Sequence, residues 1–336
     1  MKGKFVCLLL SFSLLLFQGC DRVSAPLSSG QPASAMGFYL DTVVTMNAYG
    51  LEQEALQTIL KSCASYEALL SRHVEGSDVW RINHSGGAAV KVSEDTVCIL
   101  SVAQAIAEAS DGAFDVTIAP ASALWNFTEG EARLPDAAVL EEAAAQVDYT
   151  RLRMQGNTVT LPAGMAVDLG GVAKGYIADR LAQACLEAGA SGGTVNLGGN
   201  VVVFGSREDG APWRVAIQDP NQQNGAYLGW LTLPQGGSAV TSGINQRGFD
   251  LNGIRYHHIL DTLTGWPVQN ELASVTILSE SSLLGDALST ACFALGAAGG
   301  MDLLETMEGT EGVFVTREGE VLCTPGAQAC FTLWEG

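Results

Sequence analysis

The stretch VDLGGVAKGYIAD, residues 167–179, constrains the fold of this chain more than any other. A short apolar approach from Met165 ends at Asp168, two glycines follow, and apolar residues then recur at helical spacing. This order predicts a strand, a tight turn and a helix. Gly170 and Gly171 allow positive φ and a close approach of the backbone to a ligand, beside the unpaired amides of a helix N-terminus. Such a turn can hold an anion.

Lys174 lies in the first turn of that helix, where the helix dipole disfavours a cation, so a bound phosphate would stabilise it there. An ordinary glycine turn with a solvated lysine is the alternative. The spacing matches neither a Walker A loop nor a GxGxxG dinucleotide motif. Four further motifs accompany the turn: GAFDVT at 112–117, NLGGN at 196–200, HHILDTLTG at 257–265 and DALST at 286–290.

These motifs, in this order, resemble the ApbE family of FAD:protein FMN transferases, flavin-trafficking lipoproteins found outside the bacterial cytoplasmic membrane. The resemblance covers nearly everything after about residue 36. It implies Mg²⁺-dependent transfer of the FMN moiety of FAD to a Thr or Ser hydroxyl of an acceptor flavoprotein, with release of AMP. Acceptors in the family are membrane subunits of redox-driven ion pumps or extracellular electron-transfer proteins. Two alternatives are hydrolysis of FAD to FMN and AMP, and FAD binding at the cell surface without turnover.

The composition is that of a globular protein, since 47% of the 336 residues are apolar and 16% are charged. No internal repeat or linker divides the chain, which predicts a single interwoven α+β unit with two lobes. The resemblance implies an ApbE-like core related to T-folds. The net charge of -19 argues against nucleic acid as a partner, because binding it needs clustered Lys and Arg. It also means that a bound diphosphate needs local neutralisation, for example by a divalent metal.

Residues 1–20 have a basic start and an apolar run too short for an ordinary membrane span, followed by Gln-Gly-Cys. They are expected to form a lipoprotein signal peptide with Cys20 as the lipid attachment site, although the residues before the Gly-Cys pair depart from the usual pattern. An uncleaved anchor is the alternative. Residues 21–35 are expected to be a flexible tether and 36–336 the transferase domain. The protein would then be lipid-anchored on the extracytoplasmic face of the bacterial membrane.

Helical periodicity and β-rich runs alternate along this domain. Helices are expected over 51–70, 96–110, 135–147 with Asp136 as its cap, and 283–295 closed by Gly296. Residues 193–204 are expected to form a strand, a glycine turn and a second strand. Further strands are expected over 38–49, 213–218, 227–233, 255–260, 274–278, 312–316 and 321–324.

The resemblance also implies a set of flavin-binding residues. The family's first strand carries Met-Gly-Thr, where this chain has Leu40-Asp41-Thr42, and a flavin-side Tyr corresponds by position to His73. Without the resemblance, Asp115 is equally explained as a turn residue that caps the next segment. The predicted cofactor-binding residues are Leu40, His73, Ala113, Phe114, Asp115, Asp168, Lys174 and Leu260.

Asp286 and Thr290 stand four residues apart on a predicted helix and therefore lie on one face of it. Carboxylate and hydroxyl oxygens suit Mg²⁺, which keeps waters and substrate phosphates as its other ligands. The alternative is a carboxylate that interacts with the helix dipole and a threonine in the core. The resemblance implies that both residues bind the metal, together with a backbone carbonyl that corresponds by position to Gly171.

His257 and His258 are adjacent on a strand-like segment, so their imidazoles are expected to face opposite ways. His258 is the predicted catalytic residue, together with Asp286, because an imidazole can orient the acceptor hydroxyl or accept its proton near neutral pH. After Asp261, this chain has Thr262 and Leu263 where the family has Pro and Arg, which would alter the rim of the site.

Six cysteines follow Cys20. Those within apolar helical patterns are expected to be buried, namely Cys63, Cys98, Cys185 and Cys292. Cys323 and Cys330 could form a disulfide in an oxidising compartment, but the sequence does not decide it.

Overall fold

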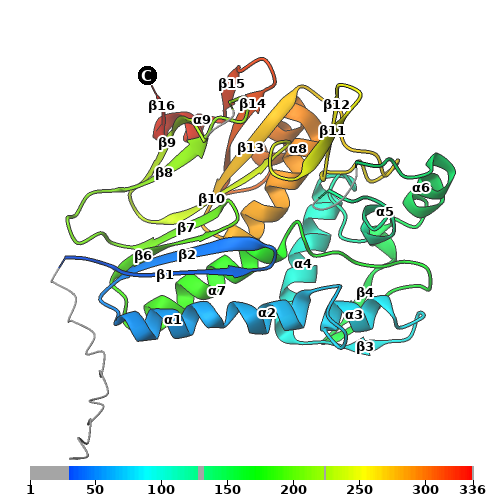
Figure 1. Ribbon diagram of the computed structural model, residues 1–336, viewed down its shortest axis with the longest axis horizontal. Coiled ribbons are helices and arrows are strands. Elements are labelled where there is room, and N and C mark those ends of the chain that lie inside the picture. The colour runs from blue at the N-terminus through cyan, green and yellow to red at the C-terminus, as the bar shows by residue number, and fades with distance from the viewer. Residues whose placement is uncertain (1–29, 128–131, 223–224, 335–336) are drawn as a thin grey trace, which may run out of the picture.

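The computed structural model describes residues 30–127, 132–222 and 225–334. An eight-stranded sheet with the order β1-β2-β6-β7-β10-β13-β14-β15 runs through the molecule (Figure 1), and every neighbouring pair in it is antiparallel. Its strands are β1 (Ala33–Tyr39), β2 (Thr42–Tyr49), β6 (Gly192–Leu197), β7 (Asn200–Gly205), β10 (Gly237–Gly243), β13 (Leu272–Ser279), β14 (Glu311–Thr316) and β15 (Val321–Cys323).

Two long helices pack on one face of this sheet: α7 (Ala173–Glu187) lies against β6 and β7, and α8 (Ser282–Glu305) lies against β10 and β13. Three further helices pack on this side, α1 (Gln53–Lys61), α2 (Cys63–Leu70) and α4 (Glu94–Ala109). In the described part of the chain, α8 is the one helix long and apolar enough to cross a membrane, but most of it is buried in the protein, as in a core helix.

A second sheet, with the order β16-β9-β8, covers part of the other face. Alternate residues of the central strands show this, because Ile277 and Phe314 belong to the helix-side core whereas their neighbours Leu278 and Val313 pack with β8 and β9. The elements of this layer are β8 (Trp213–Gln218), β9 (Tyr227–Leu233), α9 (Pro325–Cys330) and β16 (Phe331–Leu333).

The remaining elements lie to the right of the central sheet in Figure 1. Some of them share a small core formed by Ala121, Trp125, Leu140 and Leu260 with half-buried aromatic rings around it, whereas Val79, Ile82 and Val159 belong to the helix-side core. These elements are α3 (Asp78–Asn83), β3 (Val90–Lys91), α5 (Ala119–Ser122), α6 (Ala137–Ala144), η1 (Tyr149–Arg151), β4 (Arg153–Gln155), β5 (Thr158–Thr160), β11 (Gly248–Leu251) and β12 (Ile254–His257). The expected α+β class is thus confirmed.

Several expected elements differ in the structure. Residues 38–49 form no single strand, because the chain reverses at Leu40 and Asp41, whose φ values of 54° and 56° match a two-residue hairpin turn. The helix expected over 51–70 is divided at Ser62 into α1 and α2. The approach to Asp168 makes one isolated bridge, between Ala166 and Ile118. The helix expected to end at Gly296 breaks there, at φ 78° and ψ 176°, but a second helical segment of α8 follows it to Glu305.

The expected domain start at residue 36 is also too late. β1 begins at Ala33 and pairs with β2 from its first residue, so the end of the expected tether belongs to the sheet. The signal peptide, Cys20 and the rest of the tether up to residue 29 lie outside the described residues.

The cysteines follow the expectation only in part. Cys63, Cys185 and Cys292 are buried, but Cys98 is exposed on α4. Cys323 and Cys330 are free thiols in this structure, so the disulfide weighed from the sequence is not formed in it.

The contact between α7 and α8 requires a glycine at position 175, which has no side chain. A Cβ atom at Gly175 would overlap the carbonyl oxygen of Ser282 and lie 2.8 Å from the Cβ of Asp286. Only glycine therefore allows the two helices to approach this closely.

We expect Gly175→Ala to lower the free energy of unfolding by about 1–3 kcal/mol, the usual cost of overpacking a core. Urea unfolding followed by circular dichroism measures it. Gly299→Ala is the matched control, because the atoms nearest to its added Cβ belong to the partly exposed Leu295 of the same helix. An equal, small effect in both variants would contradict the helix contact.

Candidate functional site

Asp286 lies in α8, where its side chain meets the start of α7. The residue is 3% exposed, and its Oδ2 accepts a hydrogen bond of 2.9 Å from the backbone amide of Gly175. Its Oδ1 is 4.0 Å from Nζ of Lys174. Among the described residues Oδ1 has no hydrogen-bond donor, so a buried carboxylate oxygen is left with capacity for another ligand.

Thr290 lies one helical turn after Asp286. Its Oγ1 donates to the Asp286 carbonyl at 3.4 Å and lies 3.3 Å from Oγ of Ser242, which is itself 2.8 Å from Oγ of Ser289. A Cβ built on Gly171 would be 3.7 Å from the Thr290 Oγ1. The structure thus brings together the three predicted metal ligands, which come from two segments far apart in the sequence.

Ser242, at the end of β10, is a contact that the sequence analysis did not single out. It is buried and holds the Thr290 hydroxyl from the side of the sheet. Only the fold reveals this contact, because it packs α8 against β10.

The glycine turn before α7 has a different backbone conformation from the one expected. Neither Gly170 nor Gly171 has a positive φ, so the predicted conformation of the turn is wrong. Val172 provides no side-chain cap for α7, but the amide of Ala173 donates to the Leu169 carbonyl at 2.8 Å and that of Gly175 to Asp286. Among the described residues the amides of Gly171 and Lys174 have no acceptor, which leaves these two available to a ligand. Lys174 Nζ donates to the Gly170 carbonyl at 2.8 Å and so lies over the turn.

Asp168 has several protein partners. Its Oδ1 accepts from the amide of Gly170 at 2.9 Å, and its Oδ2 lies 3.2 Å from both Nη1 of Arg72 and Oγ of Ser122. Arg72 also donates through Nε to the imidazole of His73 at 3.1 Å. Two predicted flavin-binding residues, Asp168 and His73, are therefore joined through Arg72, which the sequence analysis missed.

Both carboxylate oxygens of Asp115 accept hydrogen bonds within the protein. It is 6% exposed and accepts hydrogen bonds from the amide and hydroxyl of Thr117 and from the amide of Tyr149. Burial raises the pKa of its carboxyl, although these hydrogen bonds oppose the change. The structure shows the turn-capping role that was weighed as the alternative, and a contact with flavin is an untested prediction.

The other predicted flavin-binding residues occupy three environments. Phe114 is buried, and its ring lies 3.5 Å from a Cβ built on Gly171, which places it beside the candidate metal ligands. Ala113, which precedes it, is half-buried. Leu40 is half-buried in the β1–β2 turn, and Leu260 is buried in the small aromatic-rimmed core.

The two adjacent histidines differ as expected. His257 is fully buried, with Nε2 3.0 Å from the Val268 carbonyl, and burial lowers its pKa to about 4. His258 is partly exposed, with Nδ1 3.3 Å from the Arg247 carbonyl. Because a carbonyl only accepts, Nδ1 carries the proton and the lone pair lies on Nε2. Enclosure by protein, and then the charge of Lys174, lower the pKa of His258 to about 3.

The loop after His258 is tied to the segment that carries Phe114. Asp261 Oδ1 accepts from the amides of Leu263 and Thr264, which fixes the turn, and Thr262 Oγ1 donates to the Gly112 carbonyl at 2.7 Å. The Thr and Leu that replace the family's Pro and Arg therefore still form an ordered rim.

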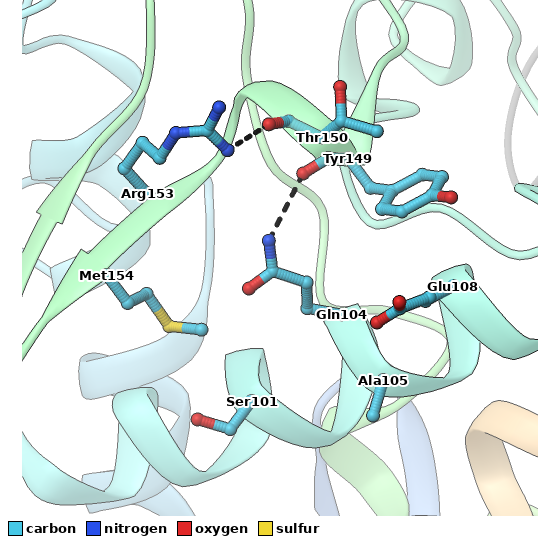
Figure 2. A pocket seen from close by; sticks show the side chains of 8 residues that line it. All are labelled: Ser101, Gln104, Ala105, Glu108, Tyr149, Thr150, Arg153 and Met154. Atoms are coloured by element: carbon cyan, nitrogen blue, oxygen red, sulfur yellow. Dashed lines mark hydrogen bonds between the residues drawn. The ribbon is translucent and has the colours of Figure 1, made fainter.

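A cavity of about 600 Å³ lies elsewhere, between α4 and the η1–β4 segment (Figure 2). Gln104 at its base donates to the carbonyls of Tyr149 and Leu152. The cavity is open to solvent and contains no predicted site residue. It is lined by Ser101, Gln104, Ala105, Glu108, Tyr149, Thr150, Arg153 and Met154.

Across residues 30–127, 132–222 and 225–334, no group of three or more His, Cys, Asp or Glu side chains could hold a metal ion. A metal at Asp286 would therefore take its other ligands from hydroxyl and carbonyl oxygens, from water or from a substrate.

The comparisons with known proteins all lead to one family. The model of the ApbE family matches residues 39–314. A protein of Klebsiella pneumoniae named FAD:protein FMN transferase is 32% identical over 300 residues, which cover 88% of this chain and 93% of that protein. One of the same name from Treponema pallidum is 32% identical over 289 residues, covering 81% of this chain and 80% of the relative.

Solved structures of the same family also superpose on this chain. The crystal structure of the ApbE protein of Thermotoga maritima superposes with a TM-score of 0.83 at 31% identity, covering 89% of this chain and 99% of that one. The flavin transferase ApbE of Vibrio cholerae superposes with a TM-score of 0.80 at 26% identity, with the same coverage.

The two adjacent histidines generate a prediction about pH. Their folded pKa values, about 4 and about 3, lie below the unfolded value of about 6.5, so the unfolded chain binds more protons in acid. The free energy of unfolding should therefore fall as the pH is lowered from about 7 to about 5. His258→Gln, which cannot titrate, should lose about 2 kcal/mol less over this interval. Urea titrations at each pH measure the difference, and equal pH slopes would refute it.

Proposed function

This chain belongs to the ApbE family, and we propose that it transfers the FMN moiety of FAD to a Thr or Ser hydroxyl of an acceptor protein, with release of AMP. Its relatives, which match it over most of its length, are named FAD:protein FMN transferases. One observation carries the site assignment: Asp286, Thr290 and Gly171 converge at the start of α7, where the amides of Gly171 and Lys174 have no acceptor among the described residues. Hard oxygen ligands next to free amides suit a diphosphate with its metal.

In the proposed reaction the acceptor hydroxyl oxygen forms a bond to the FMN-side phosphorus. The bond from that phosphorus to the bridging oxygen breaks, and AMP leaves with its electron pair. The hydroxyl proton passes to Nε2 of His258, which is unprotonated because Nδ1 donates to Arg247. The low pKa of this imidazole keeps it neutral and able to accept a hydrogen bond at neutral pH.

Lys174 and the α7 amides would bind the phosphate oxygens. The ammonium group lies over the glycine turn and near Asp286, so it can move between the Gly170 carbonyl and a phosphate. Positioning and charge neutralisation are the main contributions that a protein makes to phosphoryl transfer.

The residues present also fit Mg²⁺. Asp286 Oδ1 has free acceptor capacity in a buried position, and the Thr290 hydroxyl and the proposed Gly171 carbonyl are hard oxygen donors. When bound, Mg²⁺ would neutralise the charge of the diphosphate.

The flavin ring is proposed to lie near Phe114 and His73, with Leu40, Ala113, Asp115 and Leu260 behind or around it. Support comes from Phe114, which is beside Gly171, and from Arg72, which connects His73 with Asp168.

We also propose that the protein is exported and lipid-anchored through Cys20 on the extracytoplasmic face of the membrane. The basic, apolar and Gly-Cys pattern of residues 1–20 supports this. The acceptors would then be extracytoplasmic domains of membrane redox pumps or extracellular electron-transfer proteins that carry a short Thr/Ser flavinylation motif.

The deciding experiment incubates the protein with FAD, Mg²⁺ and one such extracytoplasmic domain carrying a Thr flavinylation motif, hereafter the acceptor domain. Mass spectrometry then weighs the acceptor domain and the nucleotides. An acceptor domain heavier by one FMN, with AMP released, establishes the transfer. Free FMN and AMP beside an unmodified acceptor domain would favour hydrolysis, and intact FAD would favour a binding protein without turnover.

Asp286→Ala should lower transfer by about a hundredfold or more, because charge stabilisation at the phosphates is lost, while FAD still binds more weakly. Transfer rates and FAD titrations at several Mg²⁺ concentrations measure both effects. Asp302→Ala removes an exposed carboxylate from the same helix and should leave transfer unchanged. Unimpaired transfer by Asp286→Ala would remove this residue from the site.

His258→Ala should lower turnover by about a hundredfold with little change in FAD affinity, the usual scale for a general base. His258→Gln separates two roles, because an amide can orient the acceptor hydroxyl but cannot take its proton. Equal losses in both variants would indicate proton transfer, and rescue by Gln would indicate orientation. His84→Ala, on an exposed imidazole stacked on Trp80, is the control. Wild-type turnover in His258→Ala would exclude the residue from the mechanism.

A further inference from the structure

The β1–β2 hairpin carries large apolar side chains on its surface. Met36 and Phe38 of β1 are 74% and 69% exposed, and Val43 of β2 is 50% exposed. Phe38 pairs directly with Val43, and Met36 lies two residues along the same strand, so the three side chains share one face of the hairpin. Grouped apolar residues on a surface indicate contact with another molecule more than single ones do.

The backbone of β1 is open at the same place. β1 is the edge strand of the central sheet. At Ser34 the edge is closed by the Gln53 side chain, which accepts from the Ser34 amide at 3.2 Å and donates to its carbonyl at 2.6 Å. Every second residue of an antiparallel strand directs its N–H and C=O to the same side, so Met36 and Phe38 also direct theirs away from β2. Within the described ranges no residue pairs with them.

The side-chain amide of Gln53 therefore pairs with the backbone of Ser34 as one peptide group of an additional strand would. The edge beyond it offers two further pairs of backbone donors and acceptors, flanked by apolar side chains. An extended polypeptide satisfies both features, because its own backbone pairs with the edge and its alternate side chains cover the apolar face. A lipid surface could cover the apolar side chains but offers no such backbone ladder.

The hairpin points to the candidate site. Its turn ends at Thr42, which contacts Gly198 in the β6–β7 turn, and Gly199 lies beside Gln246, whose amide binds the Thr241 carbonyl. The next residue after Thr241 is Ser242, which contacts Thr290. The pairing registers place these segments at one end of the sheet.

The distance is short enough for one peptide segment. A strand added outside β1 would be separated from β10 by β1, β2, β6 and β7, which makes five strand spacings of about 4.8 Å, or about 24 Å. An extended chain covers this distance in about seven residues.

We propose that the open edge of β1 binds an extended segment of the acceptor protein as an additional strand, which presents a Thr or Ser about seven residues away to the phosphate site. The inference rests on the proposed transfer to a protein hydroxyl. The segment should have β-branched or aromatic residues at alternate positions, to cover Met36, Phe38 and Val43.

The test measures the affinity of the full mature protein for the acceptor domain by calorimetry, separately from turnover. The variant Met36→Thr/Phe38→Thr removes the apolar side chains, and Met36→Pro removes one outward amide without affecting the pairing with β2. Both should bind the acceptor domain about tenfold more weakly or worse, as expected for loss of interface anchors, with unchanged FAD affinity. Tyr227→Thr, on an exposed residue of β9 in the other sheet, is the matched control.

Equal affinity for the acceptor domain in all proteins, or an equal loss in Tyr227→Thr, would overturn the inference. A wild-type dimer that dissociates in the β1 variants would also overturn the inference, because a second copy of the chain would then cover the edge. Absence of binding between the wild-type protein and the acceptor domain would overturn it as well. FMN transfer at saturating acceptor domain reports on the proposed function by itself. Transfer that persists while the β1 variants bind normally would refute the docking edge and leave the transferase intact.

Discussion

The close contact between α7 and α8 holds the candidate site together. Because residue 175 has no side chain, its amide reaches the Asp286 carboxylate at 2.9 Å, and the glycine turn before α7 is brought beside Thr290. The same bond determines which oxygen of Asp286 is occupied and which is left for a ligand. The charged side chain of Lys174 lies next to this contact, and its charge helps to lower the pKa of His258.

Much of this arrangement could be predicted from the sequence. Helical spacing located α4 and α6, and Asp136 was correctly expected to cap the latter. Alternation located β8 and β9 with correct bounds. Asp286 and Thr290 were placed on one face of a helix by their spacing, and the fold adds Gly171 to them. Family membership, inferred from the order of the motifs, is shown by the match over residues 39–314.

The failures have physical causes. A two-residue turn with positive φ at Leu40 and Asp41 carries neither glycine nor asparagine, so no local signal marked the hairpin. The positive φ of Gly296 breaks α8 where the sequence predicts a helix end, but the helical segment that follows it to Glu305 was not expected. Arg72 and Ser242 could not be found from spacing at all, since their partners Asp168 and Thr290 lie in other segments of the chain.

The bond between Gly175 and Asp286 joins residues 111 positions apart. Contacts of such long sequence separation form late, because closing the long loop between the two residues costs entropy before the contact can stabilise the chain. The proposed phosphate site would therefore not exist in a nascent or partly folded chain, even where single helices have already formed. If export occurs as proposed, a chain crossing the membrane unfolded would be catalytically silent on the inner side. Activity would be confined to the compartment where folding is completed, without any separate inhibitor.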